Sequence, residues 1–97
     1  MAYDLGAIDA ALAAAVGDDR VMIAELRMAF VDSARHAFAA LDDADDSVAW
    51  CEAAWRLRGL AASFGAVRLM ALATEALDGG VSDPVLLGRM RRMLDRL

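Results

Sequence analysis

The sequence predicts an all-α fold, an antiparallel four-helix bundle with a short additional N-terminal helix. Apolar residues recur every three or four positions over most of the chain, which is the period of one helix face. No stretch shows the alternation of β-branched and aromatic residues that is typical of strands. Alanine, the strongest helix former, supplies 23 of the 97 residues, and proline occurs once. This length suits a single domain, residues 1–97, with short turns between antiparallel helices.

The first two helices are predicted from their apolar spacing and from the residues at their ends. The first covers about residues 5–16 and stops at Gly17, a residue suited to the left-handed backbone of a helix end. Asp18 or Asp19 can then cap a long second helix over about residues 19–42. The apolar residues that define these helix faces are Leu5, Ile8, Leu12 and Val16, and then Met22, Leu26, Phe30, Ala34, Ala37 and Leu41.

Three further helices are predicted after an acidic turn at residues 42–47. The third covers about residues 47–64, and the fourth covers about residues 66–78 and ends at two glycines. The last, over about residues 84–96, begins where capping residues precede the only proline. The residues that mark these ends are Asp46 or Ser47, Gly79 and Gly80, and Ser82, Asp83 and Pro84.

The charge of the chain is divided unevenly between its two parts. Residues 1–55 carry 11 acidic residues and 3 arginines, a net charge of −8, whereas residues 56–97 carry 7 arginines and 4 acidic residues, a net charge of +3. The total of −5 is unfavourable for non-specific binding to nucleic acid, which relies on a basic surface. We therefore expect no nucleic-acid partner.

The sequence offers few residues for catalysis or metal binding. It contains one histidine and one cysteine, which exclude most zinc sites and histidine-based catalytic triads. The acidic turn lacks the central glycine and terminal glutamate of a calcium-binding EF-hand loop. We therefore expect no enzyme activity, no metal and no cofactor. We expect a cytoplasmic protein without a membrane partner. The reasons are a single unpaired cysteine, the absence of a basic leader and the lack of an apolar run of membrane length.

The third helix has apolar residues on two opposite faces. A core stripe comprises Trp50, Ala53, Leu57, Leu60, Ala61 and Phe64. The opposite side, which we call the Trp55 face, comprises Val48, Cys51, Trp55, Gly59 and Ala62, flanked by Glu52, Ser63, Arg56 and Arg58. A helix that is apolar on both sides can be the fully buried centre of its bundle. A large aromatic among small residues with a polar rim instead favours a docking surface, and a mid-helix glycine costs about 1 kcal/mol unless a partner needs the space.

Part of this region resembles the signature of histidine-containing phosphotransfer (HPt) domains, which reads Ala-His-x-Leu-Lys-Gly-Ser-Ser-x-x-x-Gly-Ala-x-x-Leu-x-x-Leu. The matching run is Ala54-Trp55-Arg56-Leu57-Arg58-Gly59-Leu60-Ala61-Ala62-Ser63-Phe64-Gly65-Ala66, followed by Leu69 and Leu72. The length, the long preceding helix and the acidic turn also agree, so the resemblance extends over nearly the whole chain. Its most specific element is the spacing between Leu57-Arg58-Gly59 and Gly65-Ala66.

The resemblance implies a four-helix bundle of two-component signalling, in which a mid-helix histidine carries phosphoryl groups between receiver domains. Trp55 stands at the position of that histidine, Arg58 matches the adjacent basic residue, and Gly59 matches the glycine that lets the partner approach. The next two family positions, usually small and hydroxylated, are Leu60 and Ala61. An indole nitrogen has no available lone pair and cannot accept a phosphoryl group. We therefore expect a non-catalytic pseudo-HPt module that docks the receiver domain of a response regulator or hybrid histidine kinase without relaying phosphate.

Two other functions fit the sequence. The Trp55 face can pack against the same face of a second copy, which would make the chain a self-associating structural bundle, a homodimer. Alternatively, His36 can serve as the phosphoacceptor of an active phosphotransfer protein, although we expect a solvated residue about 120° from Phe30 around the second helix. We expect Cys51 to be a packing residue, and the arginines of residues 89–97 to complement the dipole of the last helix.

Overall fold

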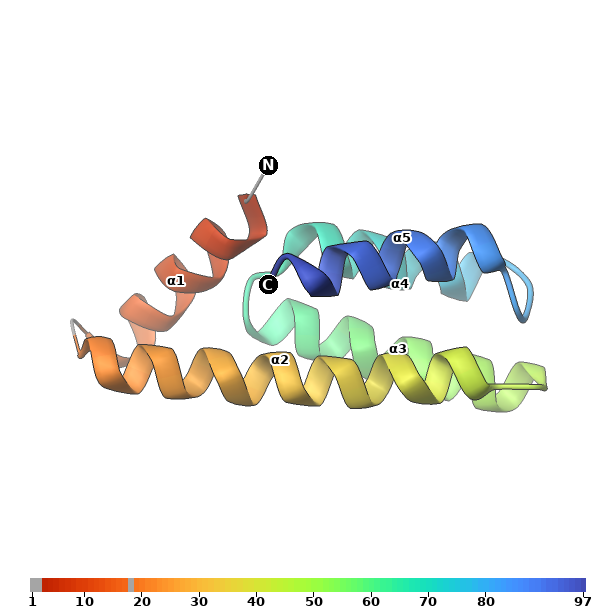
Figure 1. The fold of residues 1–97 in the computed structure, drawn as a ribbon, viewed down its shortest axis with the longest axis horizontal. Coiled ribbons are helices and arrows are strands. Elements are labelled where there is room, and N and C mark those ends of the chain that lie inside the picture. The colour runs from red at the N-terminus through yellow and green to blue at the C-terminus, as the bar shows by residue number, and fades with distance from the viewer. Residues whose placement is uncertain (1–2, 18) are drawn as a thin grey trace.

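The computed structural model describes residues 3–17 and 19–97, and within these residues the fold is all-helical, as predicted (Figure 1). Its helices are α1 (Tyr3–Val16), α2 (Arg20–Asp43), α3 (Ser47–Ser63), α4 (Val67–Asp78) and α5 (Pro84–Asp95). Each bound lies within about two residues of the range predicted from the periodicity. No helix in the described ranges is both long enough and apolar enough to cross a membrane.

Aspartate side chains begin three of these helices, as the sequence predicts. Their carboxylates accept hydrogen bonds from backbone N–H groups that lack a partner inside the helix. The bonds run from Met22 to Asp19 at 3.0 Å, from Ala49 to Asp46 at 2.8 Å and from Leu86 to Asp83 at 3.2 Å. Gly17 follows α1 with a φ of 76°, the left-handed conformation expected of it. Asp18 and the side chain of Leu5 lie outside the described part of the molecule.

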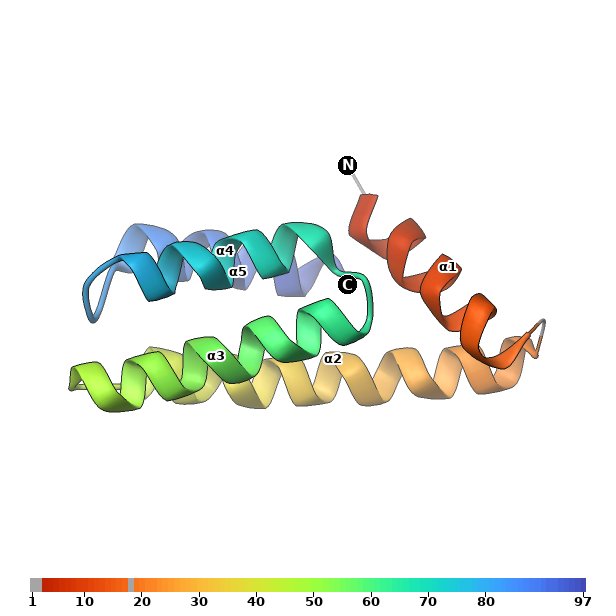
Figure 2. The ribbon, with the colours of Figure 1, turned by 180° about the vertical axis from the view of Figure 1, so that it is seen from behind.

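Four of the helices lie lengthwise side by side, and α1 crosses the end of the group obliquely (Figures 1 and 2). The helix α3 packs against both α2 and α4, while α5 packs against α4 and α2. The helix α1 contacts α2 and α4. The described Cα atoms extend over 43 × 23 × 18 Å, and among the described helices α3 packs against α2 and α4 only. One face of α3 consequently stays free of other helices.

The core lies between these helices and is built from few large side chains. Its largest fully buried residues are Trp50, Phe30, Ile8, Leu41, Leu57, Leu69, Met90 and Leu94, with alanines such as Ala34, Ala61 and Ala73 between them. The rings of Phe30 and Phe64 pack with their centroids 4.7 Å apart. The Nε1–H of Trp50 donates to the carbonyl oxygen of Ala76 at 2.7 Å, which links α3 to the last turn of α4. Small residues let the helices approach closely, and Trp50 fills the space that remains.

The beginning of α2 differs from the prediction. The spacing placed Met22 on the buried face, but 44% of its surface is exposed. The reason is a difference in length, because the 24 residues of α2 span about 36 Å and the 17 residues of α3 only about 26 Å. The first turns of α2 therefore extend past α3, and Val21 and Met28 are exposed there as well.

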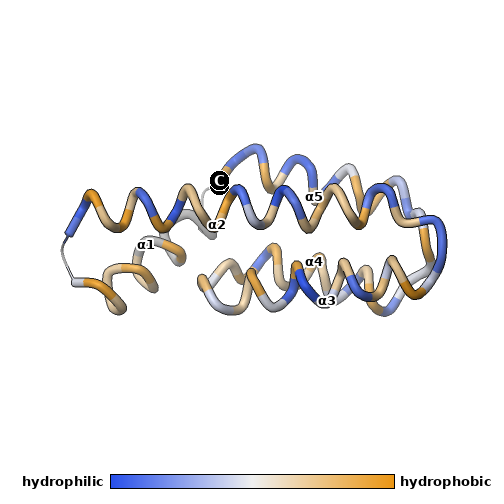
Figure 3. Tube along the Cα trace, turned by 90° about the horizontal axis from the view of Figure 1, so that it is seen from below, coloured by the Kyte–Doolittle hydropathy of each residue, from blue (hydrophilic) through white to orange (hydrophobic). Residues whose placement is uncertain are grey.

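Ion pairs at the surface tie α5 to its neighbours. They join Arg35 to Asp95 at 3.5 Å, Arg91 to Asp42 at 3.3 Å and Arg89 to Glu75 at 2.9 Å. All six side chains are substantially exposed, so each pair contributes at most about 1 kcal/mol. Each of the three pairs includes a residue of α5, and Figure 3 shows that hydrophilic residues recur along this helix.

Candidate functional site

The orientation of α3 is determined by its core stripe. Trp50, Ala53, Leu57 and Ala61 are buried, and Leu60 and Phe64 are half-buried against the same core. This arrangement fixes the rotation of the helix and directs the opposite stripe toward solvent. The prediction that α3 has one core face and one outward face is confirmed for these residues, and α3 is not a fully buried central helix.

Trp55 lies at the centre of the outward face. It has 59% of its surface exposed, whereas Trp50, on the same helix, has 1%. The guanidinium carbon of Arg58 lies 5.2 Å from the centroid of the Trp55 ring, within the range of a cation–π contact. Arg58 is half-buried and follows Trp55 by about one turn of α3. The pair presents a flat aromatic surface next to a positive charge.

Small residues continue the face on the next turns of α3. Gly59 is exposed, and a Cβ built on it would meet no atom within 4 Å. The fold itself therefore does not require a glycine at this position. Ala62 is exposed beside it, and the hydroxyl of Ser63 donates to the carbonyl oxygen of Gly59 at 2.9 Å. The surface on this side of Trp55 is consequently open to a close approach by another molecule.

The edges of the Trp55 face differ in exposure. Val48 is 66% exposed, and Glu52 and Arg56 are exposed, with neither charged side chain in an ion pair within the described residues. Cys51 is half-buried and packs against the core, so it belongs to the border of the face rather than to its outward surface. This position agrees with the expectation that Cys51 is a packing residue.

His36 lies away from α3 on an exposed part of α2, as the sequence predicts. Its Nδ1–H donates to the carbonyl oxygen of Asp32 at 2.7 Å, one turn earlier in the same helix. The bond fixes the tautomer of the neutral ring and leaves Nε2 with the lone pair. Within the described residues, no three histidine, cysteine, aspartate or glutamate side chains gather closely enough to hold a metal ion.

Comparisons with known proteins identify no relative. No protein-family model matches the chain, and no curated protein and no solved structure is significantly similar to it. The resemblance to HPt domains therefore depends on the residues of α3 and α4 themselves. The exposure and the contacts of those residues are therefore the observations from which a function can be proposed.

Proposed function

We propose that the chain is a pseudo-HPt module, an antiparallel four-helix bundle with an added N-terminal helix that docks a receiver domain and relays no phosphate. The observation that carries this proposal is the 59% exposure of Trp55 at the position where HPt domains have their phosphorylated histidine. The receiver domain would belong to a response regulator or a hybrid histidine kinase. Both partners would meet in the cytoplasm, where such receivers act.

A contribution to the stability of the fold does not explain why Trp55 is at this position. Trp50 already supplies the large buried aromatic of α3, and Trp55 contributes little to the core. Contiguous exposed apolar surface with a polar rim usually marks a docking site. Val48 and Trp55 form the apolar part here, and Glu52, Arg56 and Ser63 lie around it.

In the proposed complex, the Trp55 face covers the receiver surface around its phosphorylatable aspartate. The indole acts as the apolar anchor, and Gly59 gives the receiver backbone room to approach. Arg56 and Arg58 meet the acidic pocket of the receiver or its phosphoryl group, with which guanidinium groups form strong charge-assisted hydrogen bonds. Trp55 cannot take the phosphoryl group, because the indole nitrogen is a donor only. The module therefore sequesters or modulates the receiver.

The area of Trp55 sets an upper bound on what this anchor contributes to binding. The exposed 59% of a surface of about 250 Å² amounts to about 150 Å². At about 25 cal/mol per Å², its burial contributes at most about 3.7 kcal/mol. Ordering of both surfaces reduces this value, so Trp55→Ala should weaken binding by about 1.5–3 kcal/mol, or roughly 10- to 150-fold in Kd.

A binding titration against purified receiver domains, with and without a beryllofluoride phosphoryl mimic, tests the proposal. The native chain should bind at least one receiver, and Trp55→Ala should lose most of the affinity. Val85→Ala is the control, because Val85 is 72% exposed on α5, outside the Trp55 face. Equal affinities of the two variants, or the absence of binding to every receiver, would overturn the proposal.

Two further measurements separate the alternatives. Sedimentation should show a monomer of 10.3 kDa, whereas a tight dimer that Trp55→Ala dissociates would favour the self-associating bundle. Incubation with a phosphorylated receiver should leave no acid-labile phosphate on the chain. Uptake that is abolished by His36→Ala would instead identify an active phosphotransfer protein that uses His36.

A further inference from the structure

The first half of α2 carries a row of apolar residues on a side that faces away from the core. Figure 1 shows the first turns of this helix extending past α3 and α5, with α1 beside them. The row consists of Val21, Ala24, Met28 and Val31, which we call the α2 seam. Val21 and Met28 have 69% and 67% of their surface exposed, Ala24 is exposed and Val31 is half-buried. Contiguous exposed apolar residues of this kind are typical of an interface.

The α2 seam has the spacing by which two helices pair in a coiled coil. Such helices have apolar residues at positions a and d of a seven-residue repeat, abcdefg. Val21 and Met28 occupy position a, and Ala24 and Val31 occupy position d. The next a position is Arg35, which forms an ion pair with α5, so the seam ends before it. The seam therefore covers about 15 Å of helix.

The charged residues on the two sides of the α2 seam have opposite signs. Arg20 and Arg27 occupy position g on one side, and Glu25 and Asp32 occupy position e on the other. In a parallel pair of identical helices, position g of one copy lies beside position e of the next repeat in the other copy. Arg20 then faces Glu25 of the second copy, and Arg27 faces Asp32. In an antiparallel pair, position g lies beside g and position e beside e, so like charges would meet.

The charge match depends mainly on Arg20 and Glu25. Both side chains are exposed, and neither forms an ion pair with another described residue. Arg27 already has an interaction within its own chain, so we give less weight to its position. Arg20 also lines a hollow of about 560 Å³ between α1 and α2, together with two residues of the α2 seam. The hollow leaves room beside the seam for the side chains of another helix.

We propose that the α2 seam binds the same seam of a second copy of this chain, with the two α2 helices parallel. A second copy fits because both signs of charge occur on the one helix, so each ion pair forms twice around a two-fold axis. A seam of about 15 Å is shorter than the interfaces of stable dimers require, so the association is reversible and the dilute chain is a monomer. The Trp55 face lies on α3 and takes no part in this pairing.

Sedimentation equilibrium of the full chain at increasing concentration tests this inference. The mean mass should rise from 10.3 kDa toward twice that value as the concentration approaches about 1 mM. Met28→Arg places a charge inside the seam and should weaken the association at least tenfold. Val85→Arg is the matched control, because Val85 is 72% exposed but lies on α5. Met28 is exposed, so its replacement should leave the fold intact, as circular dichroism can verify.

Charge reversal tests the parallel orientation. Glu25→Arg should weaken the association, because Arg20 of one copy would then face an arginine of the other. The double variant Arg20→Glu/Glu25→Arg should restore it, because the two charges are only exchanged. In an antiparallel pair Glu25→Arg would instead strengthen the association, since it would remove repulsion between acidic residues. That result would overturn the parallel arrangement.

The remaining outcomes distinguish the α2 seam from other surfaces. A native chain that stays monomeric at the highest concentration would overturn the inference. Equal weakening in Met28→Arg and Val85→Arg would also overturn it, because it would show a general effect of charge. Trp55→Ala should associate like the native chain, so this test is independent of receiver docking. Dissociation by Trp55→Ala and not by Met28→Arg would assign the self-association to the Trp55 face instead.

Discussion

The same substitution should have very different effects on stability at the two tryptophans of α3. Trp50 is buried and donates a hydrogen bond, whereas Trp55 is mainly exposed. Replacing each with phenylalanine keeps an aromatic ring and removes the indole N–H. We expect Trp50→Phe to destabilise the fold strongly and Trp55→Phe to leave its stability almost unchanged.

The magnitude for Trp50→Phe follows from its surroundings. The carbonyl of Ala76 lies in the last turn of α4, where helix carbonyls lack an N–H partner within the helix. Loss of the Trp50 bond leaves that buried carbonyl unsatisfied, which costs about 1–3 kcal/mol. The smaller ring also leaves a void of roughly 40 Å³, which at about 24 cal/mol per Å³ costs about 1 kcal/mol. The sum is about 2–4 kcal/mol, out of a typical total of about 5–15 kcal/mol.

Urea unfolding followed by circular dichroism at 222 nm measures this difference without relying on tryptophan fluorescence. Trp50→Phe should lower the free energy of unfolding by about 2–4 kcal/mol with an unchanged m-value, and lower Tm by about 10–25 °C. Trp55→Phe, the matched control, should lie within about 0.5 kcal/mol of the native chain. A loss below about 0.5 kcal/mol in Trp50→Phe, or an equal loss in both variants, would refute the assignment of one tryptophan to the core and one to the surface.

Three other substitutions test the turn and the docking face. Gly59→Ala should raise stability by up to about 1 kcal/mol in thermal melts, because the site is helical and open, and should weaken receiver binding by adding a methyl group to the face. Gly65→Ala should lower the free energy of unfolding by about 1–2 kcal/mol in urea titrations, because Gly65 has a φ of 71° in the turn between α3 and α4. Trp55→His should take up acid-labile phosphate from a phosphorylated receiver, whereas the native chain should take up none. Unchanged stability in Gly65→Ala, or phosphate uptake by the native chain, would contradict the respective expectation.

Local signals in the sequence were sufficient to predict the helices. Glycine at a positive φ, aspartate before a helix and proline in its first turn act through the backbone of neighbouring residues. The outward position of Trp55 was also predictable, because helical periodicity places it opposite Leu57 and Ala61. Cys51 was placed less accurately, since its half-buried state depends on how closely α3 packs on its neighbours.

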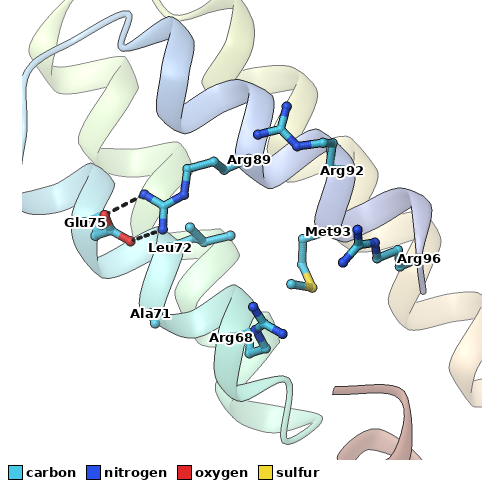
Figure 4. A pocket seen from close by; sticks show the side chains of 8 residues that line it. All are labelled: Arg68, Ala71, Leu72, Glu75, Arg89, Arg92, Met93 and Arg96. Atoms are coloured by element: carbon cyan, nitrogen blue, oxygen red, sulfur yellow. Dashed lines mark hydrogen bonds and ion pairs between the residues drawn. The ribbon is translucent and has the colours of Figure 1, made fainter. Parts of the chain in front are cut away.

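Features that depend on two helices could not be predicted in this way. The bond from Trp50 to Ala76 joins residues 26 positions apart, and helical periodicity says nothing about the register between α3 and α4. The same holds for a hollow between α4 and α5 that is lined by Arg68 and by arginines of α5 (Figure 4). The run of arginines at residues 89–97 predicted only an interaction with the dipole of the last helix, and the position of Arg68 beside that helix is visible only in three dimensions.

The proposed docking face is tested most directly by the two indole N–H signals of the chain in a proton–nitrogen correlation spectrum, with Trp55→Phe assigning them. On titration with a receiver domain that binds, the Trp55 signal should shift or broaden to saturation. The Trp50 signal, held by its bond to Ala76 inside the core, should stay in place. A receiver that binds at saturation and leaves the Trp55 signal unchanged would contradict docking through the Trp55 face.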